Sequence, residues 1–177
     1  MKFIVEDTNI IIDLFKTGLL SFCKNLELEF HTTRYVVAEV LESSQSAVLI
    51  GMINNGQLLI DNFVGEEYEQ LIKYIAECNG ENNLSAADCS VLLLAKRLEC
   101  RLLTSDQKLK RKAEEHGVEV NGFLWLTDLL VEEQIVTEKT MVKHLNRYLE
   151  TNPRAPENEV VKRIDFYNKK IIMNNKL

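Results

Sequence analysis

Residues 2–9 read Lys-Phe-Ile-Val-Glu-Asp-Thr-Asn, a short apolar run that ends in two acids, a hydroxyl and an amide. The run from Lys2 to Glu6 is typical of a strand buried in a parallel sheet. Binding sites in open parallel sheets form just outside the carboxyl ends of the strands, which is where Asp7 stands. An aspartate at this place also commonly caps the next helix, and this stretch alone leaves both interpretations open.

The pattern beyond this strand alternates between strand and helix. Helical spacing is expected from residue 10 up to Gly18 and in a second stretch to about Asn25. It is also expected over residues 33–41, 47–54, 66–78, 85–99, 108–116, 123–132, 139–150 and 157–170. Further strands are expected at residues 28–31, 57–63, 101–104 and 118–120. This alternation predicts an α/β protein with a parallel sheet covered by helices, and three helices that finish the chain.

The composition indicates a globular domain of ordinary size. The chain has 177 residues, of which 46% are hydrophobic and 27% charged, a balance typical of folded proteins with one core. No apolar run approaches the length of a membrane span, and the first residues lack the apolar segment of a signal peptide. Four separated cysteines without a C-x-x-C pair argue against zinc and disulfides, so we expect a cytoplasmic protein with reduced thiols.

The charge is unevenly distributed. The net charge of −6 is unusual for a protein that handles nucleic acid. Residues 96–112 hold seven Lys or Arg against two Asp or Glu, and residues 139–177 hold nine against four. Each segment therefore carries +5, and the rest of the chain sums to −16. The chain is therefore electrically asymmetric.

Three further acids stand at ends or first turns of expected elements, or within a helix. Asp106 follows the strand at residues 101–104, and Asp88 lies in the first turn of the apolar helix that Ser85 begins. Capping explains both, because Asp106 precedes a helix and Ser85 and Asp88 have capping-box spacing. Glu39 falls off the apolar stripe of its helix, so a solvated glutamate is the ordinary interpretation. These acids point to a function only when they are considered together.

The four acidic segments resemble the PIN-domain family in order and spacing. The segments are residues 3–9 (FIVEDTN), 37–40 (VAEV), 84–88 (LSAAD) and 103–106 (LTSD), and the resemblance covers roughly residues 2–126. It implies a PIN-like three-layer α/β/α fold with a central parallel sheet, here with extra C-terminal helices. It also implies that the acids gather in one pocket at the strand ends.

The resemblance further implies a Mg²⁺- or Mn²⁺-dependent ribonuclease. Asp7, Glu39, Asp88 and Asp106 would be both catalytic and metal-binding, with Asn9 and Thr104 or Ser105 supporting them. Clustered carboxylates form a hard, oxygen-rich site that suits these ions. Such ions activate water and neutralise the leaving oxygen of a phosphodiester.

A basic run directly after Asp106 is the candidate for binding the nucleic acid. It comprises Lys108, Lys110, Arg111 and Lys112. Lys108 and Lys112 share a helix face and form the sharper pair. The same run can equally be a solvated helix face, balanced by nearby glutamates.

For domain organisation we expect a PIN-like nuclease domain at residues 1–130. Residues 131–177 would form a helical extension that packs on this domain or on a partner subunit. Expected partners are RNA, an antitoxin protein if the chain is the toxin of a toxin–antitoxin pair, and a second copy in a homodimer, with no membrane.

Two other functions remain open from the sequence. A receiver-like signalling domain would use Glu6 and Asp7 for metal, Asp61 as phospho-acceptor and Thr104 as the switch hydroxyl. That interpretation lacks the lysine it needs after the last strand. The second alternative is a catalytically silent PIN-type module that only binds nucleic acid.

Overall fold

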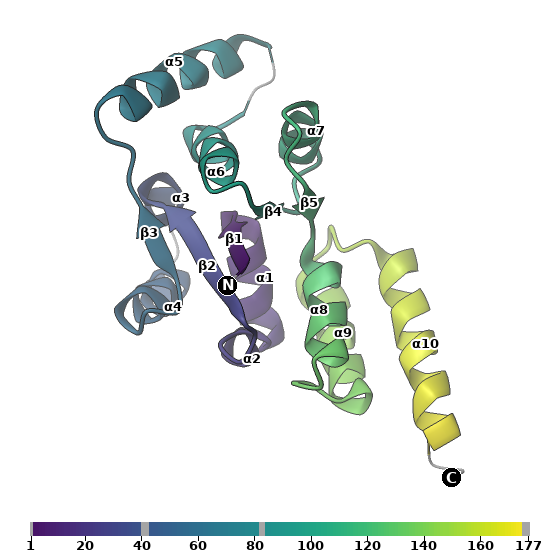
Figure 1. Cartoon of the computed structure of the whole chain (residues 1–177). Coiled ribbons are helices and arrows are strands. Elements are labelled where there is room, and N and C mark those ends of the chain that lie inside the picture. Colours follow the sequence, from purple (N-terminus) through teal and green to yellow (C-terminus); the bar gives the residue numbers. More distant parts are fainter. Residues whose placement is uncertain (1, 40–42, 82–83, 175–177) are drawn as a thin grey trace. The chain divides into compact units, whose positions relative to one another are not determined.

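The computed structural model describes residues 2–39, 43–81 and 84–174. Its five strands form one sheet in the order β3-β2-β1-β4-β5, and every neighbouring pair is parallel (Figure 1). The strands are β1 (Lys2–Glu6), β2 (Leu28–Thr33), β3 (Leu59–Asp61), β4 (Arg101–Leu103) and β5 (Val120–Asn121). The predicted parallel sheet is confirmed.

The helices connect the strands and complete the chain. They are α1 (Thr8–Thr17), α2 (Leu20–Cys23), α3 (Arg34–Glu39), α4 (Ser43–Asn54), α5 (Glu66–Glu81), α6 (Ala86–Arg97), α7 (Gln107–Glu115), α8 (Phe123–Glu132), α9 (Glu138–Thr151) and α10 (Glu157–Asn174). None of the helices within the described ranges is long and apolar enough to cross a membrane.

The chain divides into two compact units. The sheet unit comprises Met1–Ile11 and Glu27–Gly122, and the helical unit comprises Ile12–Leu26 and Phe123–Leu177. The boundary falls inside α1, whose first residues belong to the sheet unit and whose last residues belong to the helical unit. The domain boundary expected at residue 130 stays a prediction.

Helix α6 is the centre of the sheet unit. It packs on β1, β2 and β4, and α3 and α5 pack on it in turn. Seven of its twelve residues are buried, as the apolar character of this segment predicts. The step from β2 to β3 runs along the sheet in the direction opposite to the step from β4 to β5. Right-handed crossovers therefore place α4 and α7 on opposite faces.

The helical unit is held together by its own polar and aromatic contacts. Phe123 of α8 stacks on Tyr148 of α9 with ring centroids 4.1 Å apart. Arg163 of α10 binds the carboxylate of Asp128 of α8 through its Nε at 2.9 Å. In the same unit, Nδ1 of His144 lies 2.7 Å from the backbone oxygen of Thr17. The segment 12–26 is thus tied to the C-terminal helices.

Several element boundaries differ from the sequence expectation. Helix α5 runs through Asn79 and Gly80 to Glu81, because one glycine costs a helix only about 1 kcal/mol. Strand β3 has three residues rather than seven, since this edge strand has β2 as its only partner. Part of the helix expected at residues 33–41 lies outside the described residues.

None of the four cysteines, all of which lie within the described ranges, forms a disulfide. Cys23, Cys78 and Cys89 are buried, and Cys100 is half-buried.

Candidate active site at the carboxyl ends of β1 and β4

The order of the strands reverses direction between β1 and β4. The chain leaves β1 towards β2 on one side of the sheet order and leaves β4 towards β5 on the other. Ligands of parallel sheets bind outside the carboxyl ends of strands that diverge in this way. The backbone N–H of Asp7 donates to the carbonyl of Leu103 at 3.0 Å. Asp7 and Thr104 therefore continue two neighbouring strands at this point.

Asp7 is the most enclosed acid of the site, with 2% of its surface exposed. Its Oδ1 accepts a hydrogen bond from the Thr8 backbone N–H at 2.7 Å. Its Oδ2 accepts from the Thr104 hydroxyl at 2.9 Å and from the Asn9 amide at 3.2 Å. Burial raises the pKa of Asp7 from 3.8 to about 6 in spite of these donors, and the charge of Asp88 acts in the same direction.

Asp88 is both a helix cap and a neighbour of the other acids. Its Oδ2 accepts from the Ser85 backbone N–H at 2.8 Å, and Ser85 Oγ accepts from the Asp88 backbone N–H at 3.1 Å. This is the capping box that the spacing allows. Burial raises the pKa of Asp88, the charge of Asp106 adds to the effect, and Lys108 opposes it. Among the described residues, Oδ1 of Asp88 has no hydrogen-bond partner.

Asp106 caps α7 and is linked to Asp7 through a shared hydroxyl. Its Oδ1 accepts from the backbone N–H groups of Lys108 and Leu109 at 2.8 and 2.9 Å. Its own backbone N–H donates to Thr104 Oγ1 at 3.0 Å, and that hydroxyl donates to Asp7. Its Oδ2 accepts no hydrogen bond from any described residue.

The structure confirms the capping roles of Asp88 and Asp106, and their role in metal binding stays a prediction. In each residue a helix end fixes one carboxylate oxygen, and the other oxygen has no hydrogen-bond partner among the described residues. Two such oxygens beside the buried Asp7 make a hard donor set. That donor chemistry fits Mg²⁺ or Mn²⁺.

The described residues contain no set of three or more His, Cys, Asp or Glu side chains placed to hold a metal ion. Magnesium commonly keeps several waters and takes only one or two protein carboxylates. The donor set around Asp7 therefore fits a partly hydrated divalent ion, although a complete protein cage is not found among these residues.

Two of the expected site residues, Glu39 and Ser105, are exposed, and their roles stay predictions. Glu39 is the last residue of α3 and is exposed, and no hydrogen bond or ion pair joins it to the other acids within the described ranges. Ser105 is exposed and makes no hydrogen bond to the acids in the same part of the chain. Asn9 and Thr104 both contact Asp7.

The basic run lies on α7 beside the site. Lys108 is exposed and close enough to Asp88 to influence its pKa. Lys110 lies 4.0 Å from Glu114, and Lys112 lies 3.1 Å from Glu115. Arg111 is exposed and has no ion pair among the described residues. Lys108 and Arg111 are therefore the two cations of the run that are not engaged with a glutamate.

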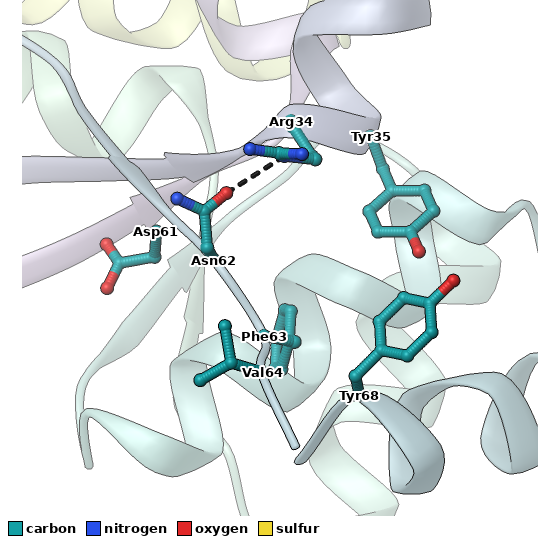
Figure 2. Close-up of a pocket in the computed structure, with 7 residues that line it drawn as sticks. All are labelled: Arg34, Tyr35, Asp61, Asn62, Phe63, Val64 and Tyr68. Atoms are coloured by element: carbon teal, nitrogen blue, oxygen red, sulfur yellow. Dashed lines mark hydrogen bonds between the residues drawn. The ribbon is translucent and has the colours of Figure 1, made fainter. Parts of the chain in front are cut away.

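A pocket that the sequence did not indicate lies at the carboxyl ends of β2 and β3. Its volume is about 250 Å³. Figure 2 shows the residues that line it, which are Arg34, Tyr35, Asp61, Asn62, Phe63, Val64 and Tyr68. They come from the start of α3 and from residues 61–68, far apart in the chain. The only early signal was that polar and aromatic residues directly follow two strands.

Asp61 does not serve as the phospho-acceptor of a receiver domain. Its Oδ2 lies 2.6 Å from Nδ1 of His31, and its Oδ1 accepts from Arg97 at 2.7 Å. Strand β3 is at the edge of the sheet and is separated from β1 by β2. Both oxygens of Asp61 are engaged, and Asp61 does not adjoin Asp7 in the sheet.

The comparisons with known proteins agree with this fold. The model of the family described as DUF3368, PIN domain, matches residues 3–169. The chain therefore belongs to the PIN-domain family, whose members are generally metal-dependent nucleases. The family resemblance and the PIN-like α/β/α fold expected from the sequence are confirmed.

Two solved structures resemble the chain at low identity. One is a PilT N-terminus domain protein of the archaeon Sulfolobus solfataricus P2, with 17% identity, a TM-score of 0.41 and coverage of 70% of this chain and 89% of that one. The other is FitAcB from Neisseria gonorrhoeae, with 21% identity, a TM-score of 0.39 and coverage of 66% and 95%. No curated protein matches the chain.

Proposed function

We propose that this chain is a Mg²⁺- or Mn²⁺-dependent endoribonuclease that uses Asp7, Asp88 and Asp106, with Glu39 as the fourth acid that the family resemblance implies. The observation that carries the proposal is the hydrogen-bonded path from Asp106 through the Thr104 hydroxyl to the buried Asp7. This path holds two acids from neighbouring strand ends at one place. Family membership supports the same chemistry.

The chain's own residues orient the site for phosphodiester hydrolysis. Thr104, Asn9 and the Thr8 backbone fix both oxygens of Asp7. Helix caps hold Asp88 and Asp106 by one oxygen each and leave the other oxygen towards the ion and substrate. A divalent ion bound there supplies Lewis-acid chemistry, because it activates water and neutralises charge on the phosphate.

RNA is favoured over DNA as the substrate. These residues lack the long insertions expected of a structure-specific DNA nuclease. We further propose that the protein acts in the cytoplasm as the toxin of a toxin–antitoxin pair and that it forms a homodimer. Exposed apolar side chains of α10, such as Phe166 and Ile172, fit packing against a partner subunit. Light scattering on the purified protein tests the dimer.

The decisive experiment measures cleavage of single-stranded RNA with Mn²⁺ and with a chelator. The variants are Asp88→Asn and Asp106→Asn, because asparagine caps helices about as well as aspartate and only the charge is lost. We expect cleavage by the wild type in Mn²⁺ alone, and a rate at least about a hundredfold lower in each variant. Asp165→Asn is the matched control, since Asp165 is exposed on α10 and outside the site.

Thermal unfolding provides a second measurement that does not depend on activity. An ion bound only by the folded protein raises the melting temperature by mass action. Mn²⁺ should therefore stabilise the wild type and the Asp165→Asn variant more than Asp88→Asn. Cleavage that persists in chelator, or in both active-site variants, would contradict the proposal. RNA binding without cleavage in Mn²⁺ would identify the catalytically silent module instead.

A further inference from the structure

The pocket at the ends of β2 and β3 has a wall that is fixed by a single arginine. Arg97, in the last turn of α6, donates to Asp61 Oδ1 at 2.7 Å, to the Asn62 carbonyl at 3.1 Å and to Glu67 Oε2 at 2.9 Å. Its guanidinium carbon also lies 5.1 Å from the centroid of the Phe63 ring. The segment after β3 is therefore held in place before any ligand arrives.

The interior of the pocket combines aromatic rings with hydrogen-bond donors. Tyr35, Phe63 and Tyr68 turn their rings towards the same space (Figure 2). Nε of Arg34 donates to Asn62 Oδ1 at 2.9 Å, which fixes both side chains. The terminal nitrogens of Arg34 and the amide nitrogen of Asn62 have no hydrogen-bond partner in the described part of the chain. These groups remain available to a ligand with acceptor atoms.

The size and chemistry of the pocket suit one flat heteroaromatic ring. Its volume of about 250 Å³ lies below the roughly 300–1,000 Å³ of pockets that enclose whole small molecules. Proteins bind unpaired bases by stacking them on aromatic side chains and by hydrogen bonds to their edges. The rings and the donors of Arg34 and Asn62 provide both kinds of contact.

The pocket shares an edge of the sheet with the acids. Strand β2 is the direct neighbour of β1, and adjacent strands lie about 4.8 Å apart. The ends of β2 and β3 are thus roughly 5–10 Å from the end of β1, a distance that a few nucleotides span even when stacked at about 3.4 Å each. Tyr35 and Glu39 are also one turn apart on the same face of α3.

We propose that this pocket binds one unpaired base of a single-stranded RNA beside the bond that the acids cleave, an inference that rests on the proposed ribonuclease function. Tyr68 and Phe63 supply stacking surfaces, and Arg34 and Asn62 donate to the acceptors of the base edge. The exposed ring of Tyr68, with 47% of its surface accessible, forms the outer side of the site.

The test compares the binding of intact RNA with that of RNA carrying one abasic nucleotide, moved position by position along the strand. Chelator is present throughout, so binding is measured without cleavage. At one position the abasic nucleotide should weaken wild-type binding between about fivefold and about a hundredfold, the range of one lost stacking contact. Tyr68→Ala should reduce the difference in affinity between intact and abasic RNA, because Phe63, Arg34 and Asn62 still contact the base, whereas Tyr68→Phe should keep the full difference.

Ile72→Ala is the matched control. Ile72 lies one turn further along α5, is exposed to 45%, nearly as much as Tyr68, and does not line the pocket. It should behave as the wild type. Equal wild-type affinity for intact and abasic RNA at every position would overturn the inference, and so would a difference in affinity that is undiminished in Tyr68→Ala. Either result would favour a protein partner as the ligand of the pocket. Because the assay needs no catalysis, a failure of the nuclease proposal shows separately as absent cleavage in Mn²⁺.

Discussion

Asp7 and Asp13 lie six residues apart in the sequence, but the groups that surround their carboxylates differ. Both are buried, with 2% and 6% of their surface exposed, and burial raises the pKa of each from 3.8 to about 6. Asp7 belongs to the sheet unit and faces the negative charge of Asp88. Asp13 belongs to the helical unit, where Nδ2 of Asn152 donates to both of its oxygens at 3.0 and 3.1 Å.

The contrast between the surroundings of Asp7 and Asp13 shows that burial of a carboxylate does not by itself indicate function. The neighbouring groups decide it. Asp13 is satisfied by the amide of Asn152 and the hydroxyl of Tyr148, and Lys16 offsets its charge. It therefore ties the end of α9 to α1 as a structural contact. The charge of Asp88 adds to the electrostatic cost of ionising Asp7. Such a cost without a compensating cation is expected where a metal or substrate completes the site.

The largest effect that we expect is a difference in RNA cleavage between variants of Asp7 and Asp13. Asp7→Asn should lower the rate of RNA cleavage in Mn²⁺ by about a hundredfold to a thousandfold, because it removes a charge that holds the ion. Asp13→Asn should change the rate by less than about threefold. Single-turnover rates at saturating RNA measure both, and circular dichroism verifies that each variant is folded. Similar losses in the two variants would show that Asp7 is also only structural.

The sequence could place the acids at strand ends because their positions depend only on the order of neighbouring residues. Asp7 and Asp106 directly follow strands, and parallel strands bring their carboxyl ends to one edge whatever their order. The sequence could not separate capping from clustering at Asp88, since a capping box uses one carboxylate oxygen and leaves the second unassigned.

The parts that the sequence missed depend on distant pairs of residues. Arg97 meets Asp61 across 36 positions, and Tyr35 joins Tyr68 in one pocket only when β2 and β3 are paired. The boundary within α1 was invisible for a different reason. A continuous helical pattern gives no sign that Asp13 belongs with Asn152 rather than with the sheet.

The next expected effect is on stability as the pH changes in the absence of metal. A folded-state pKa of about 6 against 3.8 means that the folded protein holds the proton more tightly than the unfolded chain. The free energy of unfolding should therefore fall as the pH rises from about 4 to about 6, by roughly 3 kcal/mol for Asp7. Urea unfolding at pH 4.5 and 7 should show a smaller difference in Asp7→Asn and in Asp13→Asn than in the wild type.

Saturating Mn²⁺ should separate the contributions of Asp7 and Asp13 to the pH dependence of stability. An ion held by the charged form of Asp7, as proposed, should reverse the contribution of Asp7 to the pH dependence, whereas the contribution of Asp13 should persist. Asp13→Asn in Mn²⁺ should then be the variant whose stability falls least with rising pH. If Mn²⁺ left the pH dependence of the unfolding free energy unchanged in the wild type, Asp7 would not bind the ion.

The smallest expected effect concerns how the sheet unit attracts RNA to its acids. Helical spacing alone selects Lys108 with Lys112, but Lys112 lies 3.1 Å from Glu115. Lys108 and Arg111 are exposed and outside the ion pairs of the described chain, so they are the better candidates for phosphate contacts. Lys108→Ala/Arg111→Ala should weaken RNA binding severalfold, whatever the sequence of the RNA. It should also lower the slope of log affinity against log salt by about 1.4, or about 0.7 per contact.

Lys110→Ala/Lys112→Ala is the matched control on the same helix. Both of its lysines lie beside glutamates, Glu114 and Glu115, so their removal should alter the salt slope less. The measurement is fluorescence anisotropy of labelled RNA from low to physiological salt, in chelator. Catalysis at saturating RNA should change little in either variant, because the cations act on encounter and binding rather than on the bond. An unchanged slope for Lys108→Ala/Arg111→Ala would make this helix a solvated face. The acids would then have to draw their substrate from another surface of the protein.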